Sequence, residues 1–83
     1  MAYVLYGTEA CHLCELAQQV IVEVAADIPL EVYVEDIAES EHLVASFGTR
    51  IPVLKDEQSG RELDWPFNCE ELFVWLNQKD TVS

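Results

Sequence analysis

Three spacings of apolar residues divide the first part of the chain into three elements. Residues 2–6 are apolar without alternation, which is typical of a strand at the centre of a sheet. An apolar stripe at helical spacing predicts a helix over residues 11–26, formed by Leu13, Leu16, Ala17, Val20, Ile21 and Val24. Residues 30–35 alternate between apolar and other residues, so we expect an edge strand with one buried and one solvent-facing side.

The middle of the chain predicts a short helix followed by a β-hairpin. The helix covers residues 40–47 and ends at Gly48. A strand entered through a proline covers residues 51–55, and turn-forming residues follow at 56–60. A second strand over residues 61–64 completes the hairpin.

The last helix has a recognisable start. Asn68 and Glu71 have the spacing of a capping box, and an apolar stripe follows that comprises Cys69, Leu72, Phe73 and Leu76. We expect this helix to reach residue 78. The element order is then β-α-β-α-β-β-α, and the first crossover requires parallel strands joined by a right-handed connection. We predict one α/β domain over residues 1–83, with four strands and helices on both faces of the sheet.

Composition narrows the choice of partners and compartment. The 83 residues include 16 acidic and four basic side chains, which give a formal net charge of −12. Such a surface repels phosphates, so we expect neither nucleic acid nor an anionic membrane as a partner. No signal-peptide pattern or long apolar run occurs, and three cysteines are too few for a secreted disulfide framework. We therefore predict a cytoplasmic monomer.

The motif Cys11-His12-Leu13-Cys14 carries the chemistry because it lies where the first strand gives way to the first helix. Unpaired N–H groups and the helix dipole favour negative charge there, so Cys11 can ionise more readily than a free thiol. Cys14, three residues later, can close a disulfide with it. His12 between them is expected to tune the reduction potential, whereas the carboxylates of Glu9 and Glu15 oppose thiolate formation.

This motif, the segment Thr49-Arg50-Ile51-Pro52 before the third strand, and the element order together resemble a thioredoxin-fold protein of the glutaredoxin type. The resemblance covers nearly the whole chain and is strongest to short bacterial glutaredoxin-like proteins. It implies a mixed sheet of order 2-1-3-4 and a thiol–disulfide oxidoreductase. It also implies that Cys11 is the nucleophile, that Cys14 resolves, that Pro52 is cis and that Ile51 offers its backbone to substrate.

The chain departs from that family where glutathione would bind. Phe67 and Asn68 replace the usual Gly-Gly pair, although Glu70 matches an acidic residue that would hold the γ-glutamyl end. The lysine usually found just before the first cysteine is missing, which leaves Arg50 as a candidate carboxylate clamp. We expect no bound cofactor and glutathione only as a weak co-substrate. The expected substrates are protein disulfides or small thiols, with a thioredoxin-type protein as electron donor.

Other interpretations of the motif remain open. The main alternative is a non-catalytic thioredoxin-fold module that binds a protein partner or a soft metal. Structural zinc would need four ligands, and only Cys69, His12 and His42 could join the pair. A cluster-bridging site and a copper chaperone are minority alternatives, the latter because Glu9 stands where a methionine is expected. We therefore predict no resident metal.

Two side-chain features are ambiguous in sequence. Cys69 falls on the apolar stripe of its helix, which favours a buried structural thiol over a redox role. The aromatic residues Trp65 and Phe67 flank a proline and could belong to the core or form a rim around the dithiol.

Overall fold

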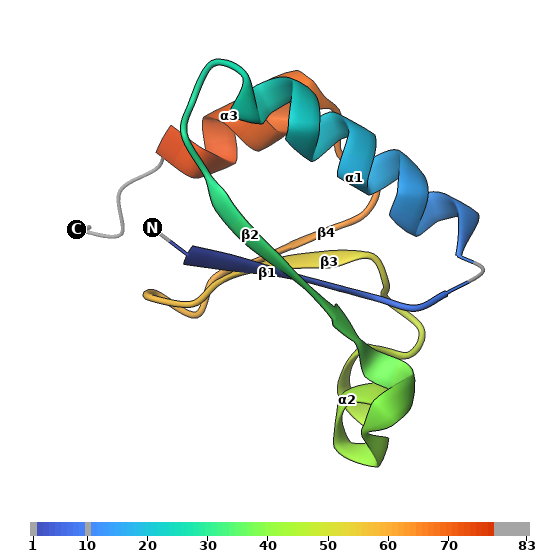
Figure 1. Cartoon of the computed structure of the whole chain (residues 1–83). Coiled ribbons are helices and arrows are strands. Elements are labelled where there is room, and N and C mark those ends of the chain that lie inside the picture. Colours follow the sequence, from blue (N-terminus) through green and yellow to red (C-terminus); the bar gives the residue numbers. More distant parts are fainter. Residues whose placement is uncertain (1, 10, 78–83) are drawn as a thin grey trace.

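A four-stranded mixed sheet forms the centre of the structure, a computed structural model that describes residues 2–9 and 11–77 (Figure 1). The strands are β1 (Ala2–Gly7), β2 (Glu31–Asp36), β3 (Val53–Asp56) and β4 (Glu62–Asp64), in the order β2-β1-β3-β4. β1 runs parallel to β2 and antiparallel to β3, and β3 and β4 are antiparallel. This is the predicted 2-1-3-4 order of the thioredoxin-like fold.

Helices cover both faces of the sheet, as predicted. α1 (His12–Ala25) and α3 (Cys69–Asn77) lie together on one face, whereas α2 (Glu41–Phe47) lies on the other (Figure 1). A single 3-10 turn, η1 (Ile37–Glu39), joins β2 to α2 and was not predicted. Among residues 2–9 and 11–77, no helix has the length and apolar character needed to cross a membrane.

The predicted capping box is present at the start of α3, and a cap that was not predicted is found at the start of α2. The Ser40 side chain caps α2, accepting from the N–H of Leu43 at 3.3 Å. At α3 the capping box is complete: the Glu71 N–H donates to Asn68 Oδ1 at 2.7 Å, and the Asn68 N–H donates to Glu71 Oε1 at 3.0 Å. These side chains satisfy backbone donors that a helix start leaves without intrahelical partners. Local sequence thus sets where both helices begin.

Alternation along β1 divides the core into two clusters. Tyr3 and Leu5 point toward α1 and α3, where they join a cluster that also contains Ala17, Ile21, Val24, Leu54, Phe67, Leu72 and Trp75. Tyr6 points to the opposite face and stacks on Phe47 of α2, with ring centroids 4.3 Å apart. Successive strand residues face opposite sides of a sheet, so one central strand anchors both layers.

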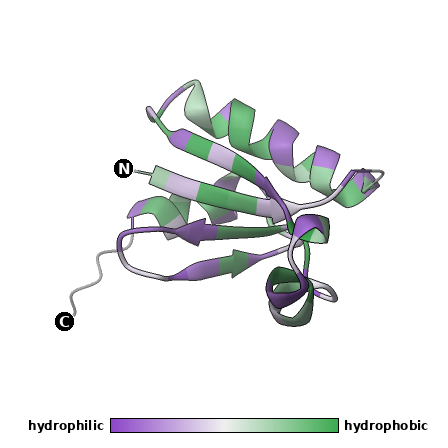
Figure 2. Ribbon diagram, turned by 60° about the horizontal axis from the view of Figure 1, so that its bottom comes forward, coloured by the Kyte–Doolittle hydropathy of each residue, from purple (hydrophilic) through white to green (hydrophobic). Residues whose placement is uncertain are grey.

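Three expected core positions are wrong. On β2, Val34 is 61% exposed, because this strand is at the sheet edge and the far end of its inner face borders an open groove. On α1, Leu13 is exposed, and the buried positions are Cys14, Ala17, Ile21 and Val24. On α3, Phe73 is exposed, whereas Leu72 is buried as predicted and Trp75, which was not in the predicted stripe, is buried as well. Figure 2 shows the alternation of apolar and polar residues along α1.

Element bounds differ from prediction by a few residues. β3 begins at Val53 rather than residue 51, and β4 at Glu62. The hairpin turn closes through Gly60, whose N–H donates to the Asp56 carbonyl at 2.8 Å and whose φ of +83° suits glycine. The described part of α3 ends at Asn77, so its predicted end at residue 78 falls outside the described residues.

Candidate functional site

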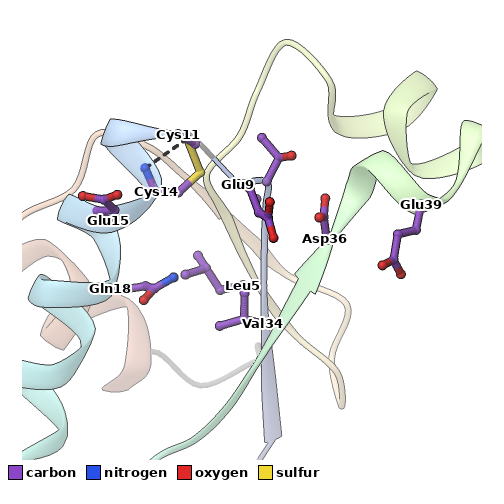
Figure 3. Close-up of a pocket in the computed structure, with 11 residues that line it drawn as sticks. Leu5, Glu9, Cys11, Cys14, Glu15, Gln18, Val34, Asp36 and Glu39 are labelled. Atoms are coloured by element: carbon purple, nitrogen blue, oxygen red, sulfur yellow. Dashed lines mark hydrogen bonds between the residues drawn. A yellow bond between two sulfur atoms is a disulfide. The ribbon is translucent and has the colours of Figure 1, made fainter.

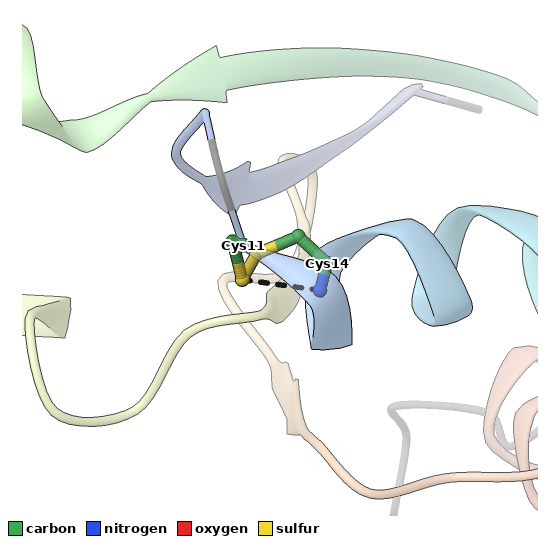
Figure 4. The surroundings of a disulfide bond; sticks show 2 residues. All are labelled: Cys11 and Cys14. Carbon is green, nitrogen blue, oxygen red and sulfur yellow. Dashed lines mark hydrogen bonds between the residues drawn. A yellow bond between two sulfur atoms is a disulfide. The ribbon is translucent and has the colours of Figure 1, made fainter.

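A disulfide joins Cys11 and Cys14 at the start of α1, with their Cα atoms 5.2 Å apart (Figure 4). Cys11 is the N-cap residue: its backbone is extended, and its Sγ accepts a hydrogen bond from the N–H of Cys14 at 3.1 Å. The sulfur therefore takes the place of the oxygen that usually caps a helix. Cys11 is half-buried, whereas Cys14 is only 4% exposed.

Gly7, the last residue of β1, lies against this disulfide. A Cβ atom on Gly7 would stand 2.9 Å from Cys14 Sγ, which is closer than van der Waals contact allows. The sulfur can pack there only because position 7 has no side chain. Sequence reasoning missed this residue, although a glycine at the end of an otherwise apolar strand is a known sign of close approach.

Pro52 reaches the same end of the sheet through the strand register. Val53, the next residue, pairs with Tyr6, which directly precedes Gly7. The Ile51–Pro52 bond is cis, as the family resemblance implied, and Pro52 is fully buried. Figure 4 shows the segment that leads from α2 into β3 next to the start of α1.

The hydrogen-bond donors expected to receive substrate are engaged within the chain. The Ile51 N–H donates to the Phe47 carbonyl at 3.1 Å. Arg50 donates to both carboxylate oxygens of Asp64, at 2.8 and 2.9 Å, and to Glu62 Oε1 at 2.6 Å. The hydrogen bond from Arg50 also lowers the pKa of Asp64 below its ordinary value. Arg50, the predicted carboxylate clamp, is therefore already bound by two carboxylates from β4.

Side chains of the capping box already engage two backbone donors at the start of α3. The N–H of Glu71 is satisfied by the capping box described above. Phe67, which stands at the first glycine position of the family pattern, is buried in the core and packs edge-to-face on Trp65 at 5.0 Å between ring centroids. Glu70 is exposed on α3 and does not line the groove beside the disulfide. Phe67 is thus a core residue rather than part of a rim.

An open groove of about 550 Å³ lies beside the disulfide (Figure 3). Its apolar floor is formed by Leu5 of β1 and Val34 of β2, and Cys11 and Cys14 close one end. The other lining residues are polar or small: Gly7, Thr8, Glu9, Glu15, Gln18, Asp36 and Glu39. Among residues 2–9 and 11–77, the groove is therefore lined by four carboxylates and by no cationic side chain.

The remaining chemical candidates lie outside the groove. His12 is exposed in the first turn of α1, and His42 is exposed on α2. Cys69 is half-buried, and its Sγ lies 3.1 Å from Glu23 Oε1. Within the described part of the chain, no three His, Cys, Asp or Glu side chains are grouped so that they could hold a metal ion.

Glu23 is expected to keep Cys69 unreactive. The Cys69 thiol donates a hydrogen bond to the Glu23 carboxylate, and this bond, together with burial and the negative charge of Glu23, raises the pKa of Cys69 above the ordinary value. A higher pKa leaves less thiolate at a given pH, so iodoacetamide at pH 8 should modify Cys69 more slowly than a free cysteine. Glu23→Gln should speed that modification severalfold, as measured by mass spectrometry. Equal rates in both proteins would remove Glu23 as the cause.

Comparisons with known proteins agree with this geometry. The family model of the glutaredoxin-like domain (DUF836) matches residues 3–77. A crystal structure of the X. campestris protein XcR50 has 36% identity and a TM-score of 0.81, over 90% of this chain and 95% of that one. Protein Ne2328 from Nitrosomonas europaea has 28% identity and a TM-score of 0.78, over 89% of this chain and 88% of that one.

A more distant structure supports the fold alone. Thioredoxin 1 from Thermosipho africanus has 15% identity and a TM-score of 0.68, over 92% of this chain and 90% of that one. No curated protein matches the chain. With a cysteine pair at the start of α1, a cis proline before β3 and a family match over nearly all its length, the chain belongs to the glutaredoxin-like domain (DUF836) family.

Proposed function

We propose that this protein is a thiol–disulfide oxidoreductase that works through Cys11 and Cys14. The observation that carries the proposal is the helix-capping position of Cys11, whose Sγ accepts the Cys14 N–H at 3.1 Å. A backbone donor aimed at sulfur stabilises negative charge there, and the helix dipole adds to the effect. The thiolate is the nucleophile in disulfide exchange, so this contact favours Cys11 as the attacking residue.

Exchange then takes two steps that move two electrons. The Cys11 thiolate attacks a substrate disulfide, so a Cys11–substrate S–S bond forms, the substrate S–S bond breaks and one substrate thiolate leaves. The Cys14 thiol loses its proton to solvent and attacks Cys11 Sγ, which closes the Cys11–Cys14 disulfide and releases the second thiolate. Both released thiolates take up protons according to their own pKa. The substrate has been reduced and the protein oxidised.

The different burial of the two cysteines supports Cys11 as the attacking residue and Cys14 as the resolving one. Both cysteines line the groove, but Cys14 is only 4% exposed, whereas Cys11 is half-buried. A substrate sulfur can approach Cys11 from the groove, and Cys14 needs to reach only Cys11. We assign no resident cofactor to the reaction, since exchange between sulfur atoms requires none.

Glutathione is proposed to be a poor electron donor for this protein. It carries a net negative charge, and three donors that could receive its carboxylates, on Arg50, Ile51 and Glu71, are engaged within the chain. We expect binding only in the millimolar range, about 4 kcal/mol. A thioredoxin-type protein, which delivers electrons through its own dithiol, does not depend on those donors.

Turnover with a neutral disulfide tests both parts of the proposal. The protein should reduce 2-hydroxyethyl disulfide when a thioredoxin with its reductase supplies electrons, measured by NADPH oxidation. With reduced glutathione and its reductase instead, the rate should be at most about one tenth of that value, because the acidic surface repels the tripeptide. Faster turnover with glutathione would contradict the donor assignment. No turnover with either system would favour the non-catalytic binding module.

A further inference from the structure

The walls of the groove beside the disulfide carry negative charge from four separate elements. Glu9 precedes α1, Glu15 lies in its first turn, Asp36 ends β2 and Glu39 belongs to η1. Figure 3 shows these side chains around the opening, with the two cysteines at one end. Any substrate sulfur that reaches Cys11 through this groove passes between these carboxylates.

The cationic side chains of the described residues do not neutralise these carboxylates. Arg50 is bound to Glu62 and Asp64 on β4. Arg61 donates to the Trp75 carbonyl at 2.7 Å and stacks over the Trp75 ring. Lys55, on β3, does not line the groove. The potential in the groove is therefore negative, because these four carboxylates are not offset by the cations of the described residues.

We propose that this groove selects disulfides carried on cationic segments of other proteins, with lysine or arginine beside the substrate cysteine. The inference rests on the proposed function, because the groove matters only if Cys11 exchanges with substrate. A volume of about 550 Å³ has room for a few side chains around the cysteine, and Val34, which is 61% exposed, offers an apolar surface to the aliphatic part of a lysine. Anionic thiols are repelled by the same walls.

Small disulfides of different charge test this preference directly. Reduced protein is mixed with cystamine, which is cationic, with 2-hydroxyethyl disulfide, which is neutral, and with 3,3′-dithiodipropionate, which is anionic. Each rate is divided by the rate of the same disulfide with dithiothreitol, so intrinsic reactivity cancels. At low ionic strength, the normalised cationic rate should exceed the anionic rate about tenfold, and 0.5 M salt should remove most of the difference.

A groove variant assigns the preference to the carboxylates. Glu9→Gln, Glu15→Gln and Glu39→Gln are combined, whereas Asp36 is kept because its side chain also caps η1 by accepting from the Ala38 N–H at 2.9 Å. All three replaced residues are exposed, so the fold should persist. In this variant, the ratio of the normalised cationic rate to the normalised anionic rate should fall at least about threefold, toward one.

A matched control removes the same charge elsewhere. The control combines Asp27→Asn, Glu31→Gln and Glu57→Gln. These three residues are exposed and do not line the groove. This variant should keep the full cationic preference. An unchanged ratio in the groove variant, or an equal loss in both variants, would overturn the inference while leaving the proposed function standing. Failure of all proteins to react with the neutral disulfide would instead refute the proposed function.

Discussion

Cys11→Ser should abolish disulfide exchange, with a loss of about three orders of magnitude or more, because a serine hydroxyl is not ionised at neutral pH. Cys14→Ser should still react once with a disulfide substrate and then stop. Its mixed disulfide on Cys11 cannot be resolved, since the buried partner sulfur is gone. Intact-protein mass spectrometry after a single exposure to 2-hydroxyethyl disulfide distinguishes the two variants.

Cys69→Ser is the matched control for these changes. Cys69 contacts Glu23 and does not line the groove, so its replacement should leave exchange unchanged. Limiting iodoacetamide on the reduced wild-type protein should modify Cys11 before the other two cysteines, because Cys14 is shielded and the Cys69 pKa is raised. A stable adduct on Cys14, or first labelling there, would reverse the assigned roles.

Gly7→Ala should destabilise the oxidised protein by about 1–3 kcal/mol, the usual cost of forcing an extra carbon into a packed site. Its Cβ would lie 2.9 Å from Cys14 Sγ, which the disulfide holds in place. In the reduced protein the Cys14 thiol can turn aside, so the loss should be smaller. Urea unfolding of both redox forms measures the difference. That difference should also make the disulfide easier to reduce, by about 30 mV for each 1.4 kcal/mol.

Gly60→Ala is the control that separates the contact between Gly7 and Cys14 from the backbone cost of replacing a glycine. Gly60 has φ +83° in the hairpin turn, and an added Cβ would meet nothing within 4 Å. The substitution should cost about 1–2 kcal/mol through the backbone alone. The cost should be equal in both redox forms, with no effect on exchange. If Gly7→Ala behaved in the same way, close packing of Gly7 against the disulfide would not be its function.

The local parts of the fold could be predicted because their signals lie within a few residues. The capping box between Asn68 and Glu71 fixed the start of α3, and the placement of Cys11 after a strand identified it at the start of α1. The edge position of β2 also followed from its pattern. Alternation in β2 nevertheless failed to show that Val34 is exposed, because periodicity does not tell which neighbours cover a face.

The details of the candidate site depend on contacts that sequence spacing does not reveal. Arg50 meets carboxylates 12 and 14 residues away across the β3–β4 hairpin, so its role as a clamp could not be judged from its neighbours. Gly7 approaches Cys14 only once β1 and α1 have packed. The groove gathers side chains from β1, α1, β2, η1 and the β1–α1 loop, and its negative charge appears only in three dimensions.

A redox titration of the Cys11–Cys14 pair tests the central claim most directly. The protein is equilibrated with thiol–disulfide buffers of graded ratio, dithiothreitol for low potentials and glutathione for higher ones, starting from the reduced form and from the oxidised form. Free thiols are counted by alkylation and mass spectrometry. We predict one two-electron transition, in which the ratio of oxidised to reduced protein changes tenfold per roughly 30 mV. The curves measured from the two directions should coincide. A pair that fails to re-form its disulfide, or that oxidises without returning, would contradict the assignment as an oxidoreductase.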